Sequence, residues 1–466
     1  MRIRIIDNLR KDFCIFLLFF LIAFFWLLNS PSFFGTLEPD SLTYIKGDSV
    51  RTSIYPYLIK FFHKENFKYI NLIYFQTFFL IFSLIFLLII LRIKGQDLLI
   101  ISVIFFFLFA NIYYISFSKT ILTEAIFFSF INFATALLIL EKTLSKSYSL
   151  SALFGFIIGG IYAIKSIGFV IFLCFFLIYF FSSIKYKKKK QIFVCLIFSS
   201  FLPILEHQLY YQKYDNRSNV LTKSITGKIF VLSGSSKFKF KDYNEDYREF
   251  LSIFKKDSQL INSYISNLKN PFLIANLKAD YEVVGQYQYE KKIKEFKVKS
   301  GIYDINNFEK NLGLSIVLNN PMEFIKISLW HYFGLWTPGG KQLFVSNYED
   351  LPLKSKLNRS SGDIIYLKKI LLVLAICLFL FLFCIFTFFS IQSIITILRR
   401  DWKKYNIFNS LCLVCQVYLI SVSITNIATP RYLMPFFPLV IIIFCLYLKE
   451  MFIILKKSLN VRSHRK

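Results

Sequence analysis

The sequence of 466 residues contains few of the groups from which soluble catalytic sites are built, with only four histidines. It has no glycine-rich phosphate loop, no nucleotide-binding signature, no His and Cys cluster at metal-ligand spacing and no internal repeat of useful length. All eight cysteines lie in apolar segments, so no disulfide framework is indicated, and Cys412 and Cys415 are interpreted as packing residues. The sequence therefore gives no sign of a disulfide-stabilised domain or of a nucleotide site.

Polar residues are also scarce, because 56% of the chain is hydrophobic and 58 residues are phenylalanine. The mean hydropathy is +0.53. No soluble domain hides this much apolar surface, which indicates an integral membrane protein. The formal net charge of +28 would suggest nucleic acid as the partner of a soluble protein. Here the placement of the cations is better explained by membrane orientation, and no nucleic-acid partner is expected.

Ten apolar windows approach the length of about 20 residues that crosses the hydrocarbon core. They are residues 13–29, 69–91, 97–117, 121–140, 149–164, 167–183, 191–210, 366–394, 405–427 and 433–454. The fifth window is short and interrupted by glycines, which also permit close helix packing. The pattern predicts an all-α polytopic membrane protein with about ten transmembrane helices.

Lysine and arginine gather at alternate ends of these windows. The basic clusters are residues 2–11, 92–94, 142–146, 185–190 and 399–404 and the tail that ends at Lys466. Short cytoplasmic loops carry an excess of Lys and Arg, so both termini are predicted to be cytoplasmic. The same clusters favour contact with anionic membrane lipids.

This topology predicts three parts. Residues 1–210 form an N-terminal transmembrane module with a first outer loop, 30–68; residues 211–362 form a mixed extracytoplasmic segment; and residues 363–466 form C-terminal transmembrane helices and a basic cytoplasmic tail. Within the middle part, residues 321–336 are apolar and aromatic and begin at a proline, which is as typical of a re-entrant or interfacial helix as of a span.

The first outer loop contains a short amphipathic pattern at residues 54–62. Its apolar residues follow the spacing i, i+3, i+4, i+7, i+8 and are Ile54, Tyr57, Leu58, Phe61 and Phe62. This spacing predicts an interfacial helix in the membrane plane. The alternative is a helix that packs on the protein itself.

Carboxylates and cations are predicted to meet at the extracytoplasmic level. Asp40 and Tyr44 are four residues apart and share one face if their segment is helical, and Arg51 follows in the same loop. Glu124 opens the fourth window at the outer side. An ionisable residue at a membrane boundary is a candidate site residue, although an acid in a first helical turn is also favoured by the helix dipole.

Three further candidates lie near membrane boundaries. Lys165 and Arg431 are candidate phosphate ligands, and their alternative role is that of snorkelling anchors. His331 is a candidate substrate contact, with an interfacial aromatic belt as the alternative. A divalent metal ion is a possible cofactor, held by Asp40, Glu38 and Glu124 if by any residues, although no complete ligand set is visible.

The order of these elements resembles the GT-C superfamily of membrane glycosyltransferases, in particular the protein mannosyltransferase-like and aminoarabinose transferase-like enzymes that use polyprenyl-phosphate sugars. The resemblance rests on EPDSLTY in the first outer loop, TILTEAIFF at the fourth window, a glycine-rich segment that ends in a cation (GGIYAIK) and RYLMPFFP before the last window. It covers residues 1–210 and, loosely, the last window. Residues 211–362 match nothing in the family.

The resemblance implies a role for each matching residue. Asp40 would be the catalytic base, although Ser41 stands where the family often has a second acid, so that Glu38 stays an alternative. Glu124 would orient the acceptor or a metal. Lys165 and Arg431 would face phosphate, Arg51 would be a further phosphate contact, and Tyr44 would line the pocket. The implied enzyme is an inverting glycosyltransferase at the extracytoplasmic face of a bacterial inner or plasma membrane. Its acceptor would be a glycolipid, polysaccharide or protein hydroxyl.

Two other functions are compatible with the sequence. A surface polysaccharide polymerase or ligase would use residues of the large outer segment, such as Arg217, Arg248 or His331. A non-enzymatic lipid or solute transporter would show internal repeats and charges at mid-membrane depth. The apolar windows are almost free of charge at their centres, which makes transport the weaker of the two.

Overall fold

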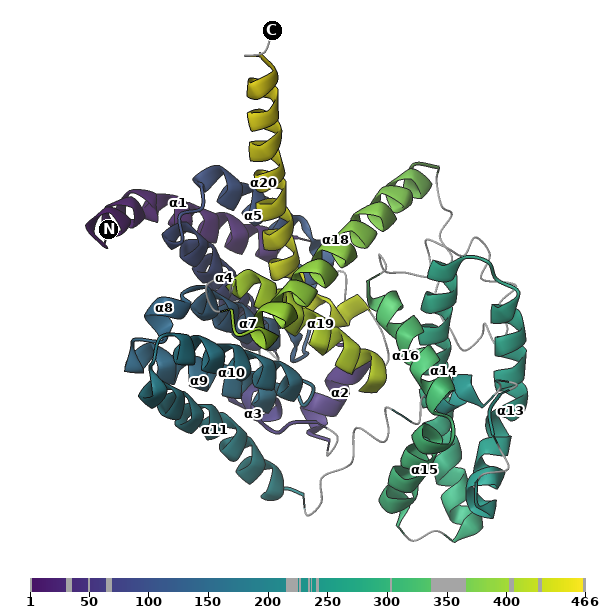
Figure 1. Ribbon diagram of the computed structural model, residues 1–466. Helices are drawn as coiled ribbons and strands as arrows, with labels where there is room; N and C mark the ends of the chain where they lie inside the picture. The colour runs from purple at the N-terminus through teal and green to yellow at the C-terminus, as the bar shows by residue number, and fades with distance from the viewer. Residues whose placement is uncertain are drawn as a thin grey trace. The chain divides into compact units, whose positions relative to one another are not determined.

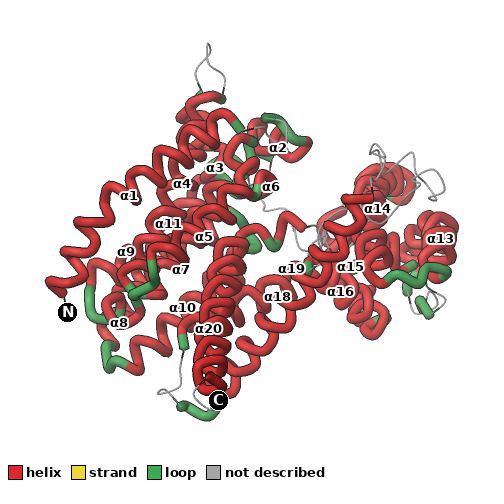
Figure 2. The backbone as a smooth tube through the Cα atoms, turned by 90° about the horizontal axis from the view of Figure 1, so that it is seen from above, coloured by secondary structure: helices red, strands yellow, loops and turns green. Residues whose placement is uncertain are grey.

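The computed structural model shown in Figure 1 describes most of the chain. The described residues are 2–30, 36–48, 51–63, 69–214, 225, 228–233, 235, 237–239, 243–301, 304–336, 366–401, 406–425 and 430–463. Within these ranges the chain forms helices and loops and no strand (Figure 2). The prediction of an all-α protein is therefore confirmed for this part of the chain.

Among the described residues, six helices are long and apolar enough to cross a membrane. The six spans lie in α1 (Arg2–Asn29), α4 (Ile70–Ile93), α11 (Lys189–Tyr211), α18 (Tyr366–Leu398), α19 (Ile407–Thr425) and at Met434–Ile454, which includes most of α20 (Phe437–Ser463). A seventh span is formed if α5 (Leu98–Ala110) and the segment Ile112–Lys119 cross the membrane together, with a bend of 62° between them. The second segment comprises α6 (Ile112–Ser116) and η1 (Phe117–Lys119). These helices are typical of an integral membrane protein.

The remaining three predicted spans are shorter helices, so ten full spans are not confirmed. They are α7 (Glu124–Ile139), α9 (Tyr148–Ile164) and α10 (Gly168–Lys185), with the single-turn α8 (Glu141–Leu144) between the first two. The 16 residues of α7 extend about 24 Å, less than the roughly 30 Å of a hydrocarbon core. Nearly all side chains of α7 are buried, which shows that its apolar character comes from packing inside the protein.

The helices α9, α10 and α11 lie side by side (Figure 1). Gly155 and Gly159 of α9 face the backbone of α11 so closely that a Cβ at either position would overlap the carbonyl groups of Cys195 or Ser199. Gly155 and Gly159, which interrupt the fifth apolar window of the sequence, are thus required for the close packing of α9 on α11.

We expect Gly159→Ala to lower the free energy of unfolding by about 1–3 kcal/mol, because the added methyl group must push α9 away from α11. Thermal unfolding of the purified protein in lipid nanodiscs measures the change. Gly334→Ala is the matched control, since its Cβ would lie 3.6 Å from Ala275, an ordinary contact. A stability of Gly159→Ala equal to that of the control would contradict the close packing.

The chain divides into two compact units. Unit 1 comprises Met1–Asn216, Phe386–Cys415 and Met434–Lys466, and unit 2 comprises Arg217–Ile385 and Gln416–Leu433. Both units therefore include parts of the C-terminal helices α18 and α19.

Unit 1 contains two short helices from the predicted outer loop, α2 (Pro39–Lys46) and α3 (Ile54–Phe62). The helix α3 has the bounds that the amphipathic pattern predicts. Tyr55 and Ile59 are buried inside the protein, whereas Tyr57 and Phe61 of the apolar stripe face outward, and Phe61 is 80% exposed. The helix thus packs on the protein with one side and presents an apolar side to its surroundings. Its place in the membrane plane stays a prediction.

Unit 2 contains most of the predicted extracytoplasmic segment, whose described part consists of helices joined by loops. Its main helices are α13 (Glu245–Ser266), α14 (Pro271–Ser300), α15 (Ile305–Asn319) and α16 (Pro321–Leu335). They enclose an apolar core rich in aromatic rings, which includes Phe250, Phe254, Tyr289 and Phe308. This core gives the segment its own packing centre.

Candidate functional site

The helix α2 begins and ends at defined capping residues. Glu38 and Ser41 form a capping box, and the backbone N–H of Glu38 donates to Ser41 Oγ over 2.9 Å. Gly47 ends the helix with φ of +62°, a left-handed conformation that glycine adopts without strain. Between these caps, Asp40 and Tyr44 lie on one face of the helix, as their spacing predicts.

Arg51 returns from the following turn onto this face of α2. Its guanidinium forms an ion pair with Asp40 Oδ1 at 2.7 Å and donates from Nε to Thr43 Oγ1 at 2.8 Å. The guanidinium carbon also lies 4.6 Å from the centre of the Tyr44 ring, within cation–π range. Burial on its own would lower the pKa of Arg51, but the nearby Tyr44, Asp40 and Glu124 raise it overall. Arg51 is therefore a permanently charged group.

Hydroxyl groups connect this ion pair to a second one. Arg51 donates to the Tyr44 hydroxyl at 3.5 Å, and that hydroxyl lies 3.3 Å from Thr123 Oγ1. Thr123 in turn donates to Glu124 Oε2 at 3.4 Å, and Lys165 Nζ forms an ion pair with Glu124 Oε1 at 2.9 Å. Since Thr123 has a single hydroxyl proton, its bond to Glu124 makes Tyr44 the donor to Thr123.

We call this set of six residues the polar chain: Asp40, Arg51, Tyr44, Thr123, Glu124 and Lys165. The structure thus brings together five of the seven site residues predicted from the sequence, from the first loop, α7 and the end of α9. Thr123 is the additional member. It was missed because a threonine before an acid has no signal in the sequence beyond that of a helix start.

The two carboxylates of the polar chain differ in accessibility. The side chain of Asp40 is 36% exposed, whereas that of Glu124 is 4% exposed. Its partner Lys165 lies over the ring of Phe127. Only Asp40 can be approached directly from outside. Glu124 is covered by protein, and its carboxylate is bonded to Thr123 and Lys165.

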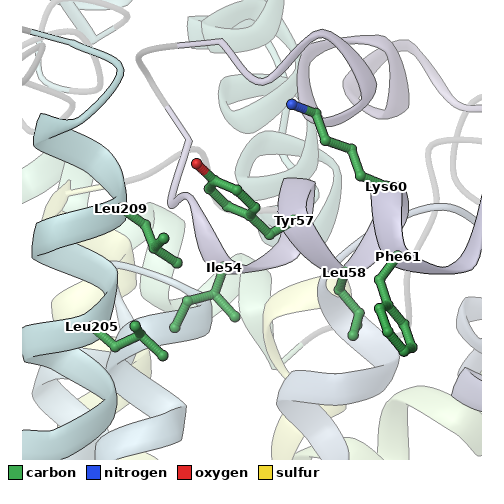
Figure 3. Close-up of a pocket in the computed structure, with 7 residues that line it drawn as sticks. All are labelled: Ile54, Tyr57, Leu58, Lys60, Phe61, Leu205 and Leu209. Carbon is green, nitrogen blue, oxygen red and sulfur yellow. The ribbon is translucent and has the colours of Figure 1, made fainter.

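An apolar groove of about 590 Å³ lies on the outward side of α3, next to α11. Figure 3 shows its lining residues, which are Ile54, Tyr57, Leu58, Lys60, Phe61, Leu205 and Leu209. Lys60 is the one cation among these seven side chains. The groove therefore combines apolar walls with a single positive charge.

Residues 51–54 join the groove to the polar chain. Arg51 belongs to the polar chain, and Ile54, three residues later, belongs to the groove. Between them, Thr52 Oγ1 donates to the carbonyl of Ile164, the neighbour of Lys165, at 2.7 Å. The backbone N–H of Ser53 donates to Glu206 Oε1 of α11 at 3.4 Å. These two hydrogen bonds hold residues 52 and 53 against α9 and α11.

The carboxylates considered as metal ligands are engaged with other groups in the structure. Asp40 pairs with Arg51, Glu124 pairs with Lys165, and Glu38 takes part in the capping box of α2. Within the described ranges, no three His, Cys, Asp or Glu side chains converge as a metal site would require.

Arg431 and His331, the other two predicted site residues, belong to unit 2. Arg431 lies in a 3₁₀ turn, Pro430–Tyr432, and its guanidinium carbon is 5.5 Å from the centre of the Tyr432 ring. Of the residues proposed for a polymerase or ligase, Arg248 donates to the backbone carbonyl of Tyr243 at 3.0 Å. Arg217 lies outside the described residues.

His331 is part of a fully buried cluster with Lys228 and Glu282, each 0% exposed. Lys228 Nζ lies 2.8 Å from His331 Nδ1 and 3.2 Å from Glu282 Oε1, and His331 Nε2 lies 3.0 Å from Glu282 Oε2. Burial raises the pKa of Glu282 to about 7 and, with the charge of Lys228, lowers that of His331. A neutral His331 accepts at Nδ1 from Lys228. Lys228 and Glu282 together carry no net charge, whether the proton between them lies on the amine or on the carboxyl group.

The chain matches no protein-family model, no curated protein and no solved structure.

Proposed function

We propose that the chain is a membrane glycosyltransferase that moves a sugar from a polyprenyl-phosphate donor to an acceptor hydroxyl at the extracytoplasmic face of the membrane. The observation that carries the proposal is the polar chain, in which two carboxylates and two cations are connected and lie next to an apolar groove. A lipid phosphate donor combines an anionic leaving group with a long apolar chain. The cations of the polar chain match the phosphate, and the apolar groove matches the lipid chain.

In this proposal Asp40 is the base, because its carboxylate is the more exposed of the two. Asp40 takes the proton of the acceptor hydroxyl while the acceptor oxygen forms a bond to the anomeric carbon. The bond from that carbon to the phosphate oxygen breaks, and the lipid phosphate leaves with the electron pair. Attack opposite the leaving group inverts the anomeric configuration.

Arg51 and Lys165 supply positive charge for the departing phosphate. Cations placed where negative charge develops stabilise the transition state most when the site excludes water, and both side chains are at least three quarters buried. Glu124 holds Lys165 in position. Because Glu38 is used in the cap of α2, it is the weaker candidate for the base.

The Arg51→Gln variant is expected to bind a polyprenyl-phosphate sugar about 10- to 100-fold more weakly, because a charge-assisted hydrogen bond to phosphate is lost. Binding is measured by titrating the donor into the purified protein in nanodiscs. Lys299→Gln, which removes an exposed cation of α14, is the control and should bind as the wild type does. Equal affinity of Arg51→Gln and the control would remove Arg51 from the donor site.

A further inference from the structure

The helix α16 of unit 2 has two distinct faces. Its buried side chains follow helical spacing and include those of Phe324, Ile327, Ser328, His331 and Leu335. Its outward face is equally regular: Met322, Ile325 and Leu329 are at least half exposed, and Trp330 and Phe333 are partly exposed. We call these five residues the apolar row. They include most of the lining of a second groove, of about 420 Å³, which Pro271 and Lys326 complete.

The C-terminal end of α16 contacts two membrane-spanning helices within unit 2. The Tyr332 hydroxyl donates to Gln416 Oε1 of α19. The rings of Tyr332 and Trp336 also lie 6.1 Å and 5.8 Å from that of Phe383 on α18. These contacts fix the end of α16 against the spans.

The position of Gln416 gives the depth of this contact. The span Ile407–Thr425 has 19 residues, and Gln416 is its central residue. At 1.5 Å per residue, Gln416 lies roughly 14 Å from each end of the helix, close to the middle of a hydrocarbon core roughly 30 Å thick. Tyr332, which bonds to it, therefore lies at the same depth.

We propose that α16 lies in the hydrocarbon region of the membrane, with the apolar row in contact with lipid acyl chains. Pro321 is eleven residues before Tyr332 and thus at most about 16 Å away along the helix, so this part of α16 lies between mid-membrane and the headgroups. A helix satisfies its own backbone hydrogen bonds, as lipid requires. In water, the same row would be a large exposed apolar patch.

The charged groups of α16 are placed as this environment requires. His331 faces inward and shares a buried, charge-balanced cluster with Lys228 and Glu282. Glu323 and Lys326, near the N-terminal end, form an ion pair at 3.0 Å, and Lys326 is long enough to reach the headgroup level. Intramembrane ionisable residues in general face the protein interior and are paired.

Depth-dependent fluorescence quenching tests this placement. In a variant with Trp26, Trp336 and Trp402 changed to Phe, Trp330 is the single remaining tryptophan. Reconstituted in vesicles with lipids brominated along the acyl chains, Trp330 should lose most of its emission and should resist aqueous iodide. The control adds Trp330→Phe and Val298→Trp, because Val298 is 87% exposed near the far end of α14. The control should show the reverse pattern.

Quenching of Trp330 by iodide would overturn the proposal, and so would resistance to both quenchers, which would mean that protein covers the row. If the multiple variant fails to fold, the wild-type chain can be labelled by a carbene reagent dissolved in the bilayer. Mass spectrometry should then find label on Met322, Ile325 and Leu329 and none at Val298. Absence of label on α16 would contradict the placement in the same way.

Discussion

The Asp40→Asn variant is expected to transfer sugar about 10²- to 10⁴-fold more slowly than the wild type, which is the usual contribution of one positioned general base. Asparagine retains the shape of the side chain and can still accept a hydrogen bond from Arg51, so the polar chain should keep its geometry. What is lost is the proton acceptor at the exposed carboxylate. The measurement is the initial rate of labelled sugar transfer by purified protein at saturating donor.

Asp48→Asn is the matched control for Asp40→Asn, because Asp48 is an exposed acid of the same loop and has no role in the proposed reaction. Its rate should equal that of the wild type. Glu124→Gln should lose less activity than Asp40→Asn, since Glu124 is 4% exposed and acts by holding Lys165. Wild-type rates for Asp40→Asn would show that Asp40 is not the base, and a larger loss in Glu124→Gln would transfer that role to Glu124.

The second large effect is expected on stability, at the buried cluster of unit 2. Glu282→Met should lower the free energy of unfolding by about 3–5 kcal/mol, because it leaves the cation of Lys228 buried without its partner. Lys228→Met should have a similar effect through Glu282. Denaturant unfolding in detergent measures both changes. The emission of Trp330, in a background with the other three tryptophans changed to Phe, reports on the unfolding of unit 2.

The double variant Lys228→Met with Glu282→Met separates the ion pair from simple loss of packing. Replacing a buried pair by apolar residues of similar volume is often nearly neutral, so the double variant should be more stable than either single variant. Additive losses would mean that the two charges do not interact, which would contradict the 3.2 Å ion pair.

The amphipathic helix α3 could be predicted with its bounds because its signal is local. Apolar spacing along nine residues determines the helix, and Pro56 in its first turn agrees with the start at Ile54. The number of full spans could not be predicted in the same way. The window 121–140 agrees closely with the bounds of α7, but apolar length does not reveal that the side chains of α7 are covered by protein and not by lipid.

The polar chain could be predicted in part because Asp40, Tyr44 and Glu124 lie at the ends of apolar segments, where charge is uncommon. Lys228 and Glu282 carried no such signal. They lie in a polar segment with many Lys and Glu residues, and the two partners of Lys228 are 54 and 103 positions away in the sequence. Only the tertiary packing of unit 2 distinguishes these two side chains from solvated charges.

Transfer of a labelled sugar from a synthetic polyprenyl-phosphate donor by the purified wild-type chain in nanodiscs tests the proposed function most directly. The expected result is a glycosylated acceptor of inverted anomeric configuration and an equal amount of free polyprenyl phosphate, both formed about 10²- to 10⁴-fold more slowly in Asp40→Asn. Movement of lipid or solute across reconstituted vesicles, with no covalent product from any lipid-linked donor, would contradict the proposal.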